Sequence, residues 1–300
     1  MTTTDWRVPE PLDTVEIEAT GGAPIVLRRH GDVKGPRLIL SHDNGLAIDL
    51  YYPFWSRLQS RFELIVYDLR SHGRNPTADL AHHNVATFTA DEERIRAGIE
   101  EHFGAKPAVG VFHSLSAMVA LNHDPPGRGY AGLVLFDPPM YLADGDHYGI
   151  DTLWRRLGML ARHRQPRFAT REEFAEEFRR SWVFEFTRPG VEQLAAEALI
   201  QPASDGEGYE LRCPREFEAQ VFDYGFAYAF EPDTTNFACP VKVIGGDPSV
   251  EFSSLPSVDL EGLIGWDYDF IPHTTHFLQL ENPEECVSTM IAFLEREGLA

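Results

Sequence analysis

The sequence has few cysteines and no long apolar run, and both absences limit what the chain can be. Its 300 residues include three cysteines, Cys213, Cys239 and Cys286, an odd number without close pairing. We therefore expect no disulfide framework and no cysteine chemistry. No stretch is apolar for the roughly 18 residues that a membrane helix needs, and the first ten residues are polar. We expect a cytoplasmic protein with no signal peptide and no membrane partner.

Basic residues and the usual binding motifs are scarce as well. The chain carries 26 Lys and Arg against 47 Asp and Glu, a formal net charge of −21, which repels phosphate backbones. Nucleic acid is therefore not an expected partner. The 12 histidines form no His-x-x-x-His pair, and the glycine pairs at 21–22 and 245–246 open no phosphate-binding pattern. We expect no metal and no cofactor.

The chain does contain strand patterns that alternate with helix patterns. Residues 14–20 and 24–30 predict a hairpin joined by two glycines. Further strands are predicted near 37–41, 62–67, 108–112 and 133–136, and helices over 49–59, 87–103 and 115–122. This order predicts the α/β class, with a mostly parallel sheet and helices on both faces. A chain of 300 residues with 43% apolar content can bury one large core.

The alternation stops in the middle of the chain. Residues 140–235 are helical in pattern and rich in aromatic residues. We interpret them as a helical cap, or lid, inserted after the sixth strand, with residues 1–139 and 236–300 forming the core domain. A lid excludes water and shapes a pocket, and Trp182 and Phe226 are candidates to line it. These rings favour a small apolar or aromatic substrate.

The residues around Ser114 carry the chemistry. An apolar strand leads directly into this serine, which is followed by small helix-forming residues. Such a turn presents a hydroxyl at the edge of a sheet, as in the nucleophile elbow Gly-x-Ser-x-Gly. Here the flanking positions hold Phe112 and Ser116. The pentapeptide by itself is equally compatible with an ordinary buried serine after a strand.

Two other segments supply what an active serine needs. His276 lies in a short loop between the last predicted strand and a closing helix that begins near Pro283, so it can reach over the serine. Residues 42–45 (His-Asp-Asn-Gly) follow another apolar strand, and their backbone N–H groups are free to point at an oxyanion.

In this order the segments resemble the α/β-hydrolase superfamily over nearly the whole chain. The segments that carry the resemblance are the oxyanion loop at 42–45, the Asp-x-Arg-Gly-x-Gly turn at 67–74, the elbow at 109–117, the strand ends at 133–139 and 239–247, and the histidine loop at 276–284. The resemblance implies a serine nucleophile on an α/β-hydrolase sheet with an inserted cap.

The resemblance also implies a role for each site residue. Ser114 is the expected nucleophile and His276 the expected base. Asp247, after the seventh strand, is the favoured orienting acid, although the loop is short there. Asp137, after the sixth strand, is the alternative acid.

The expected surroundings of the nucleophile come from the same two loops. The backbone N–H groups of Asn44 and Leu115 are expected to form the oxyanion hole. His42 and His113 are expected to lie beside the substrate.

The predicted function is that of a serine hydrolase. It would cleave an ester, thioester, lactone or activated C–C bond of a small apolar or aromatic substrate through an acyl-enzyme. Two alternatives use the same scaffold: a non-catalytic small-molecule receptor or carrier, and a cofactor-free perhydrolase. The sequence leaves open the substrate and the oligomeric state, including a homodimer.

Overall fold

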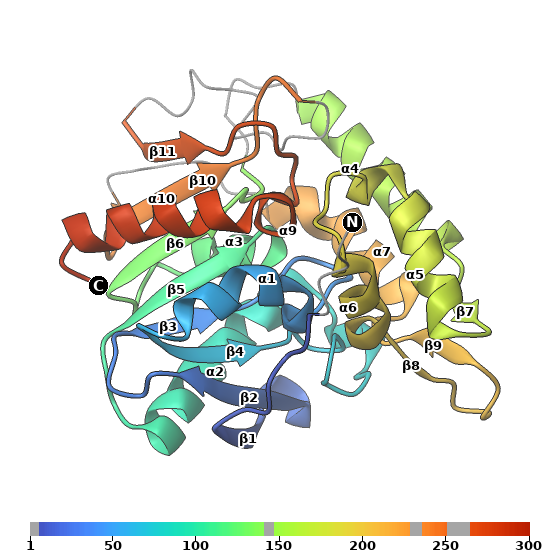
Figure 1. The fold of residues 1–300 in the computed structure, drawn as a ribbon, viewed down its shortest axis with the longest axis horizontal. Helices are drawn as coiled ribbons and strands as arrows, with labels where there is room; N and C mark the ends of the chain where they lie inside the picture. The colour runs from blue at the N-terminus through green and yellow to red at the C-terminus, as the bar shows by residue number, and fades with distance from the viewer. Residues whose placement is uncertain (1–5, 141–146, 229–235, 251–264) are drawn as a thin grey trace.

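An eight-stranded sheet forms the centre of the protein. The computed structural model describes residues 6–140, 147–228, 236–250 and 265–300. The strands lie in the order β1-β2-β4-β3-β5-β6-β10-β11 (Figure 1). Their bounds are Asp13–Glu18, Pro24–Gly31, Glu63–Tyr67, Arg37–Leu40, Ala108–His113, Gly132–Phe136, Val241–Gly245 and Asp267–Phe270, in that spatial order. From β4 to β11 all neighbours are parallel, and only the β1-β2 and β2-β4 pairs are antiparallel. The predicted mostly parallel α/β class is confirmed.

Helices cover both faces of the sheet because its strands are apolar on both sides. In β3, Leu38 and Leu40 belong to one buried cluster, whereas Ile39 between them belongs to a second cluster on the opposite face. The first face is covered by α1 (Tyr52–Trp55), α9 (Leu278–Glu281) and α10 (Pro283–Arg296), and the second by α2 (Val85–Phe103) and α3 (Leu115–Leu121). In Figure 1, α10 and α1 cross in front of the strands.

The single helix expected over residues 49–59 is wrong. The segment instead forms a 3₁₀ turn (η2, Ile48–Tyr51), the short helix α1 and a second 3₁₀ turn (η3, Ser56–Leu58). Pro53 occupies one of the first positions of α1. Because proline has no N–H to donate to the preceding turn, it begins a helix here and does not continue one.

The chain between β6 and β10 forms a group of helices and a small sheet at one end of the main sheet (Figure 1). Its elements are α4 (His147–His163), α5 (Arg171–Arg180), α6 (Val191–Ala198) and α7 (Arg215–Gly225), with a three-stranded sheet β7-β9-β8 (Arg167–Phe168, Tyr209–Leu211, Ile200–Pro202). Phe174 and Leu194 of this group share a buried cluster with Leu38 of the main sheet. The cap boundaries remain a prediction, and part of the segment lies outside the described residues. None of the helices in the described ranges has the length and apolar character that a membrane crossing requires.

Candidate active site

Ser114 occupies a strained turn between β5 and α3. Its backbone has φ 49° and ψ −108°, a conformation that residues other than glycine rarely adopt. The Ser114 N–H donates to the carbonyl oxygen of Phe136 at the end of β6, at 3.0 Å. The residue is 6% exposed. The turn therefore holds a serine at the carboxyl edge of the parallel strands, where sites in open α/β sheets lie.

The two unusual residues that flank Ser114 are accommodated by specific contacts. The ring of Phe112 is fully buried, and a Cβ atom at Gly110 would lie only 2.4 Å from it. The absence of a side chain at Gly110 thus provides the room that Phe112 needs. Ser116 Oγ accepts from His113 N–H at 3.0 Å and donates to the His113 carbonyl at 2.9 Å. Ser116 consequently closes the end of β5 with its own hydroxyl.

His276 pairs with the carboxylate of Asp137. The His276 Nδ1–H donates to Asp137 Oδ2 at 2.6 Å, and Asp137 is fully buried at the end of β6. Asp137 is held in place through its backbone, since its N–H donates to the carbonyl of Ile244 in β10 at 2.9 Å. A buried, charge-assisted hydrogen bond of this length fixes both the tautomer and the orientation of an imidazole.

The sequence-based preference for Asp247 is corrected by this geometry. Asp247 Oδ1 accepts from the Ser249 N–H and hydroxyl at 2.9 and 2.6 Å, and Asp247 Oδ2 accepts from His273 N–H at 2.8 Å. These hydrogen bonds hold the pKa of Asp247 at about 2. The Asp247 carboxylate therefore stabilises the loop to which it belongs. Asp137, the alternative acid, is the carboxylate that hydrogen-bonds to His276 Nδ1.

The loop that carries His276 is anchored from two sides. Glu281 Oε1 and Oε2 accept from the Thr275 hydroxyl and N–H at 2.5 and 2.6 Å. On the other side, His113 Nε2–H donates to the His276 carbonyl at 2.8 Å, and the Tyr51 hydroxyl donates to His113 Nδ1 at 2.6 Å. Both nitrogens of the buried His113 ring are therefore occupied. His113 thus holds the His276 carbonyl, and a substrate contact of His113 would have to be made without either ring nitrogen.

The backbone N–H groups of Asn44 and Leu115, the two predicted oxyanion donors, both point at a carboxylate oxygen of Asp43. Asn44 N–H donates to Asp43 Oδ1 at 2.6 Å, and Leu115 N–H points at the same oxygen from 3.4 Å. The other oxygen, Asp43 Oδ2, lies 3.4 Å from His276 Nε2. Among the described residues, no hydrogen bond joins His276 Nε2 to the Ser114 hydroxyl. The imidazole therefore lies between two carboxylates.

This arrangement shifts the pKa values of His276 and Asp43. Burial alone would lower the pKa of His276, but its hydrogen bonds to Asp137 and Asp43 outweigh burial and raise that pKa to about 10. Burial would raise the pKa of Asp43, but hydrogen bonds from His276 and Ser114 hold that pKa well below its usual range. The contact between these two groups therefore favours the protonated form of His276 and the ionised form of Asp43.

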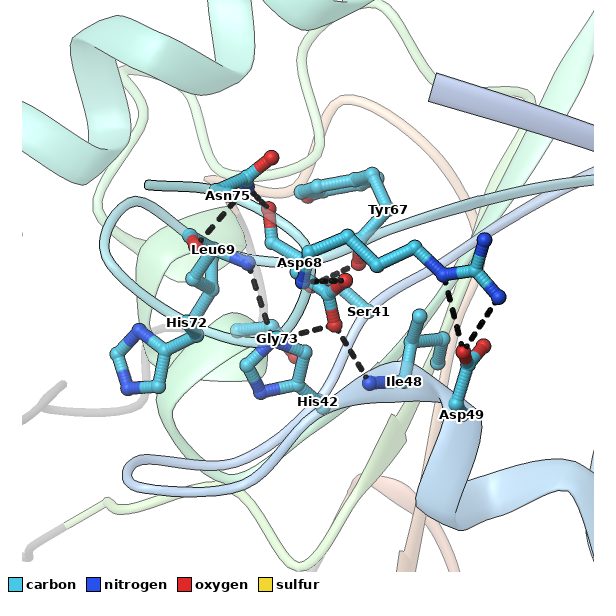
Figure 2. Close-up of polar contacts among 12 residues, drawn as sticks. Ser41, His42, Ile48, Asp49, Tyr67, Asp68, Leu69, His72, Gly73 and Asn75 are labelled. Atoms are coloured by element: carbon cyan, nitrogen blue, oxygen red, sulfur yellow. Dashed lines mark hydrogen bonds and ion pairs between the residues drawn. The ribbon is translucent and has the colours of Figure 1, made fainter. Parts of the chain in front are cut away.

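The loop after β4 is hydrogen-bonded to the loop that follows β3 (Figure 2). Leu69 N–H donates to His42 Nε2 at 3.0 Å, and Asp68 Oδ1 accepts from Ile48 N–H at 2.8 Å. His42 Nδ1–H donates to the Asp43 carbonyl at 2.7 Å. Since both of its nitrogens are used and its side chain is fully buried, His42 shapes the loop. A substrate contact of His42 would therefore have to be made without either ring nitrogen.

A comparison with known proteins fits this architecture. The sequence profile of the Alpha/beta hydrolase family matches residues 38–289. The chain belongs to the α/β hydrolase family. Similar solved structures include the E-2-(acetamidomethylene)succinate hydrolase, with a TM-score of 0.73 and 18% identity over 94% of this chain and 100% of that chain. A thioesterase domain from the curacin biosynthetic pathway has a TM-score of 0.70 and 17% identity over 93% of this chain and 98% of that one. An esterase from Thermogutta terrifontis has a TM-score of 0.64 and 20% identity over 95% and 99%.

Aromatic rings of this α/β hydrolase lie next to His276, but they are not the two singled out from the sequence. Trp182 is 58% exposed, so it does not belong to the buried cluster around Ser114. The side chain of Phe226 lies outside what the structure describes. Instead, Phe277 packs 5.2 Å from the His276 ring, and Phe184 of the inserted segment packs 4.7 Å from Phe277. Phe184 is therefore an aromatic residue of the chain between β6 and β10 that reaches the ring beside His276.

One group of side chains in the described part of the hydrolase could hold a metal ion by proximity. The ligand atoms of His72, His83 and Cys213 lie within 4.8 Å of one another and are buried. His72 already uses both nitrogens, because Nδ1–H donates to the Arg70 carbonyl and Nε2 accepts from Gly45 N–H. Burial also keeps the pKa of Cys213 well above its usual range, so its thiol stays protonated.

Asp43 is the site residue that sequence reasoning missed. Its only signal was position: a carboxylate directly before Asn44, in the loop expected to carry the oxyanion donors. Tyr51 was also missed because His113, which it holds, lies 62 residues away in the sequence. Glu281 was missed although Thr275, which it holds, lies only 6 residues away in the sequence.

Proposed function

We propose that this α/β hydrolase is a serine hydrolase that acts through an acyl-enzyme, with Ser114 as nucleophile, His276 as base and Asp137 as orienting acid. The observation that carries the proposal is the 2.6 Å hydrogen bond between His276 and Asp137, at the sheet edge where Ser114 adopts its strained turn. A nucleophile, a base and a third group that orients the base are the parts that this chemistry needs.

The proposed reaction begins when His276 Nε2 takes the proton of the Ser114 hydroxyl as its oxygen attacks a carbonyl carbon. Asp137 keeps the other imidazole nitrogen protonated and stabilises the imidazolium that forms. The N–H groups of Asn44 and Leu115 then stabilise the tetrahedral oxyanion. The imidazolium gives its proton to the leaving group, and a water molecule activated by His276 releases the acyl group in the second half of the reaction.

We infer that residues 140–235 act as a lid that shapes the acyl pocket. Two contacts of this segment reach the site loops: Asn44 Nδ2–H donates to the Glu218 carbonyl at 2.9 Å, and Arg188 N–H donates to the Leu280 carbonyl at 3.0 Å. With Phe184 against Phe277 beside the base, we propose an apolar or aromatic acyl group. The ester, thioester and lactone classes all fit this chemistry.

The proposal is tested by measuring hydrolysis of p-nitrophenyl esters and of acyl thioesters by wild type, Ser114→Ala and Ser204→Ala. Ser204 is an exposed serine in the turn between β8 and β9 and serves as the matched control. We expect Ser114→Ala to lose turnover on every compound that wild type cleaves, with Ser204→Ala unchanged. Full activity of Ser114→Ala on any of these compounds would show that another group is the nucleophile.

A small-molecule receptor is the second candidate, and one specific observation favours it. The Asp43 carboxylate occupies the two oxyanion donors, and His276 Nε2 faces Asp43 in place of Ser114. A receptor would bind an apolar ligand without any turnover and without reaction of Ser114 with a fluorophosphonate. Stoichiometric reaction of Ser114 would exclude it.

A further inference from the structure

Asp43 lies where the negative oxygen of a tetrahedral intermediate would have to lie. Its Oδ1 atom receives both backbone N–H groups that point into the site, from Asn44 and Leu115. Its Oδ2 atom faces His276 Nε2 at 3.4 Å. We propose that Asp43 is a built-in occupant of the oxyanion site, and that a substrate must displace its carboxylate before Ser114 can react. This inference rests on the serine hydrolase function proposed above.

The two occupants exclude each other because they need the same donors. A backbone N–H makes one strong hydrogen bond, and an oxyanion hole works only when its donors lie about 2.7 to 3.1 Å from the developing oxyanion. A carboxylate oxygen carries the same sign of charge as that oxyanion. The field that would stabilise the intermediate therefore stabilises Asp43 in the resting protein.

Displacement of Asp43 also changes the state of the base. While Asp43 faces Nε2, His276 keeps a proton on each ring nitrogen, and a doubly protonated ring cannot accept the proton of Ser114. Rotation of the carboxylate frees Nε2 and removes one of the two anions that raise the pKa of His276 to about 10. A single side-chain movement thus opens the oxyanion hole and releases the base.

Other titratable groups surround this pair. They are Asp137 after β6, His113 in β5, Tyr51 in η2, Glu218 in α7, Glu281 in α9, and His42 and His72 in the loops after β3 and β4. Among the described residues, the His276 ring hydrogen-bonds to Asp137 and forms an ion pair with Asp43. The pH at which the base becomes active should therefore change when Asp43 is displaced, even though the hydrogen bond from His276 to Asp137 is kept.

The same residue bears on the substrate class. The side chain of Asp43 is 13% exposed, and burial together with the charge of Asp43 raises the pKa of Glu218, so the two carboxyl groups repel each other. A substrate with a carboxylate next to its reacting carbonyl would meet this charge directly. An apolar acyl compound that carries a hydrogen-bond donor or a cationic group there could instead pair with it. We infer that the hydrolase selects the second kind.

The test measures the rate at which a fluorophosphonate labels Ser114, from about pH 5 to about pH 11, in wild type, Asp43→Gly and Asp43→Asn. Glycine removes both the occupant and its charge. Asparagine removes the charge, while its amide oxygen can still accept from the two N–H groups. Comparing the two variants therefore separates the effect of filling the oxyanion site from the effect of the negative charge. Urea unfolding of each variant checks that it folds.

We expect Asp43→Gly to label at least about tenfold faster than wild type at neutral pH, because it gains free oxyanion donors. Both variants should show a midpoint of the pH profile at least about one pH unit lower than wild type. The rate gain of Asp43→Asn at high pH, where His276 is neutral in every variant, should be smaller than that of Asp43→Gly. If Asp43→Gly does not fold, the midpoint of Asp43→Asn decides the question.

Two failures are distinguishable. If wild type labels at Ser114 and the folded Asp43 variants label no faster and with the same midpoint, the role of Asp43 is wrong and the serine hydrolase proposal stands. If Ser114 is not labelled in wild type or in either variant, the proposed function itself is wrong, and the inference about Asp43 falls with it.

Discussion

Replacing Asp137 with asparagine tests the orienting acid directly. The change keeps the shape of a fully buried side chain but removes the charge 2.6 Å from His276 Nδ1. An asparagine can accept from Nδ1–H only as a neutral amide, and it can also present its NH₂ group, which favours the wrong tautomer of the imidazole. We expect acylation of Ser114 to slow about 10³- to 10⁴-fold, the size of the effect when a buried triad carboxylate is neutralised. At about 1.4 kcal/mol for each tenfold change, this is about 4 to 5.5 kcal/mol of transition-state stabilisation.

The assay is the pseudo-first-order rate of p-nitrophenyl ester hydrolysis, or of fluorophosphonate labelling, at fixed pH. Asp247→Asn is the matched control, because Asp247 bonds to Ser249 and His273 in the neighbouring loop and not to His276. We expect that control to retain its rate within about threefold, a change of less than 1 kcal/mol. Similar mild losses in both variants would refute the assignment of Asp137 and would favour the receptor interpretation.

Further predictions concern stability. Because folding raises the pKa of His276 from 6.5 to about 10, the contribution of His276 to the free energy of unfolding is fully present below pH 6.5 and is lost as the pH rises to about 10. Urea unfolding should show a loss of about 4 to 5 kcal/mol from this group between these pH values. The variant His276→Gln should lack this pH dependence. Gly45→Ala should destabilise by roughly 1 to 3 kcal/mol more than Gly206→Ala, since both have positive φ but only a Cβ at Gly45 would meet Glu218, at 2.6 Å. Glu63→Gln should lower the free energy of unfolding by about 3 to 5 kcal/mol, because the fully buried Glu63 faces several cationic side chains; an equal result for the exposed Glu295→Gln would contradict this reasoning.

The fold could be predicted from the sequence because the central strands β3, β4, β5 and β6 are short apolar runs bounded by turn residues. Such runs are apolar on both faces when a parallel sheet is covered by helices on both sides, and this is how Leu38, Ile39 and Leu40 are divided between two clusters. The error over residues 49–59 came from a local feature. The apolar pattern there continues through Pro53, but the backbone hydrogen bonds of a single helix do not.

The residue types of the candidate site and their order along the chain could be predicted from the sequence. Which carboxylate pairs with His276 could not. Ser114 and His276 each follow a strand, and the strand ends share one edge. The choice between Asp137 and Asp247 depended on how the loop after β10 folds. The hydrogen bonds of Asp247 within that loop are set by the short spacing to Ser249 and by the distant His273, which the sequence pattern does not reveal.

Asp43 could not be assigned from the sequence for a different reason. A carboxylate beside Asn44 can point to solvent, into the loop or into the site, and only the convergence of Leu115, Asn44 and His276 selects the last. The position of the Asp43 carboxylate therefore depends on three segments of the chain that the sequence pattern does not place next to one another.

A crystal structure of the protein after reaction with a fluorophosphonate tests the central claim most directly. The account predicts a phosphorus atom bonded to Ser114 Oγ and a phosphoryl oxygen within hydrogen-bond distance of the Asn44 and Leu115 N–H groups, with the Asp43 carboxylate displaced. A phosphorus atom bonded to any other side chain would contradict it.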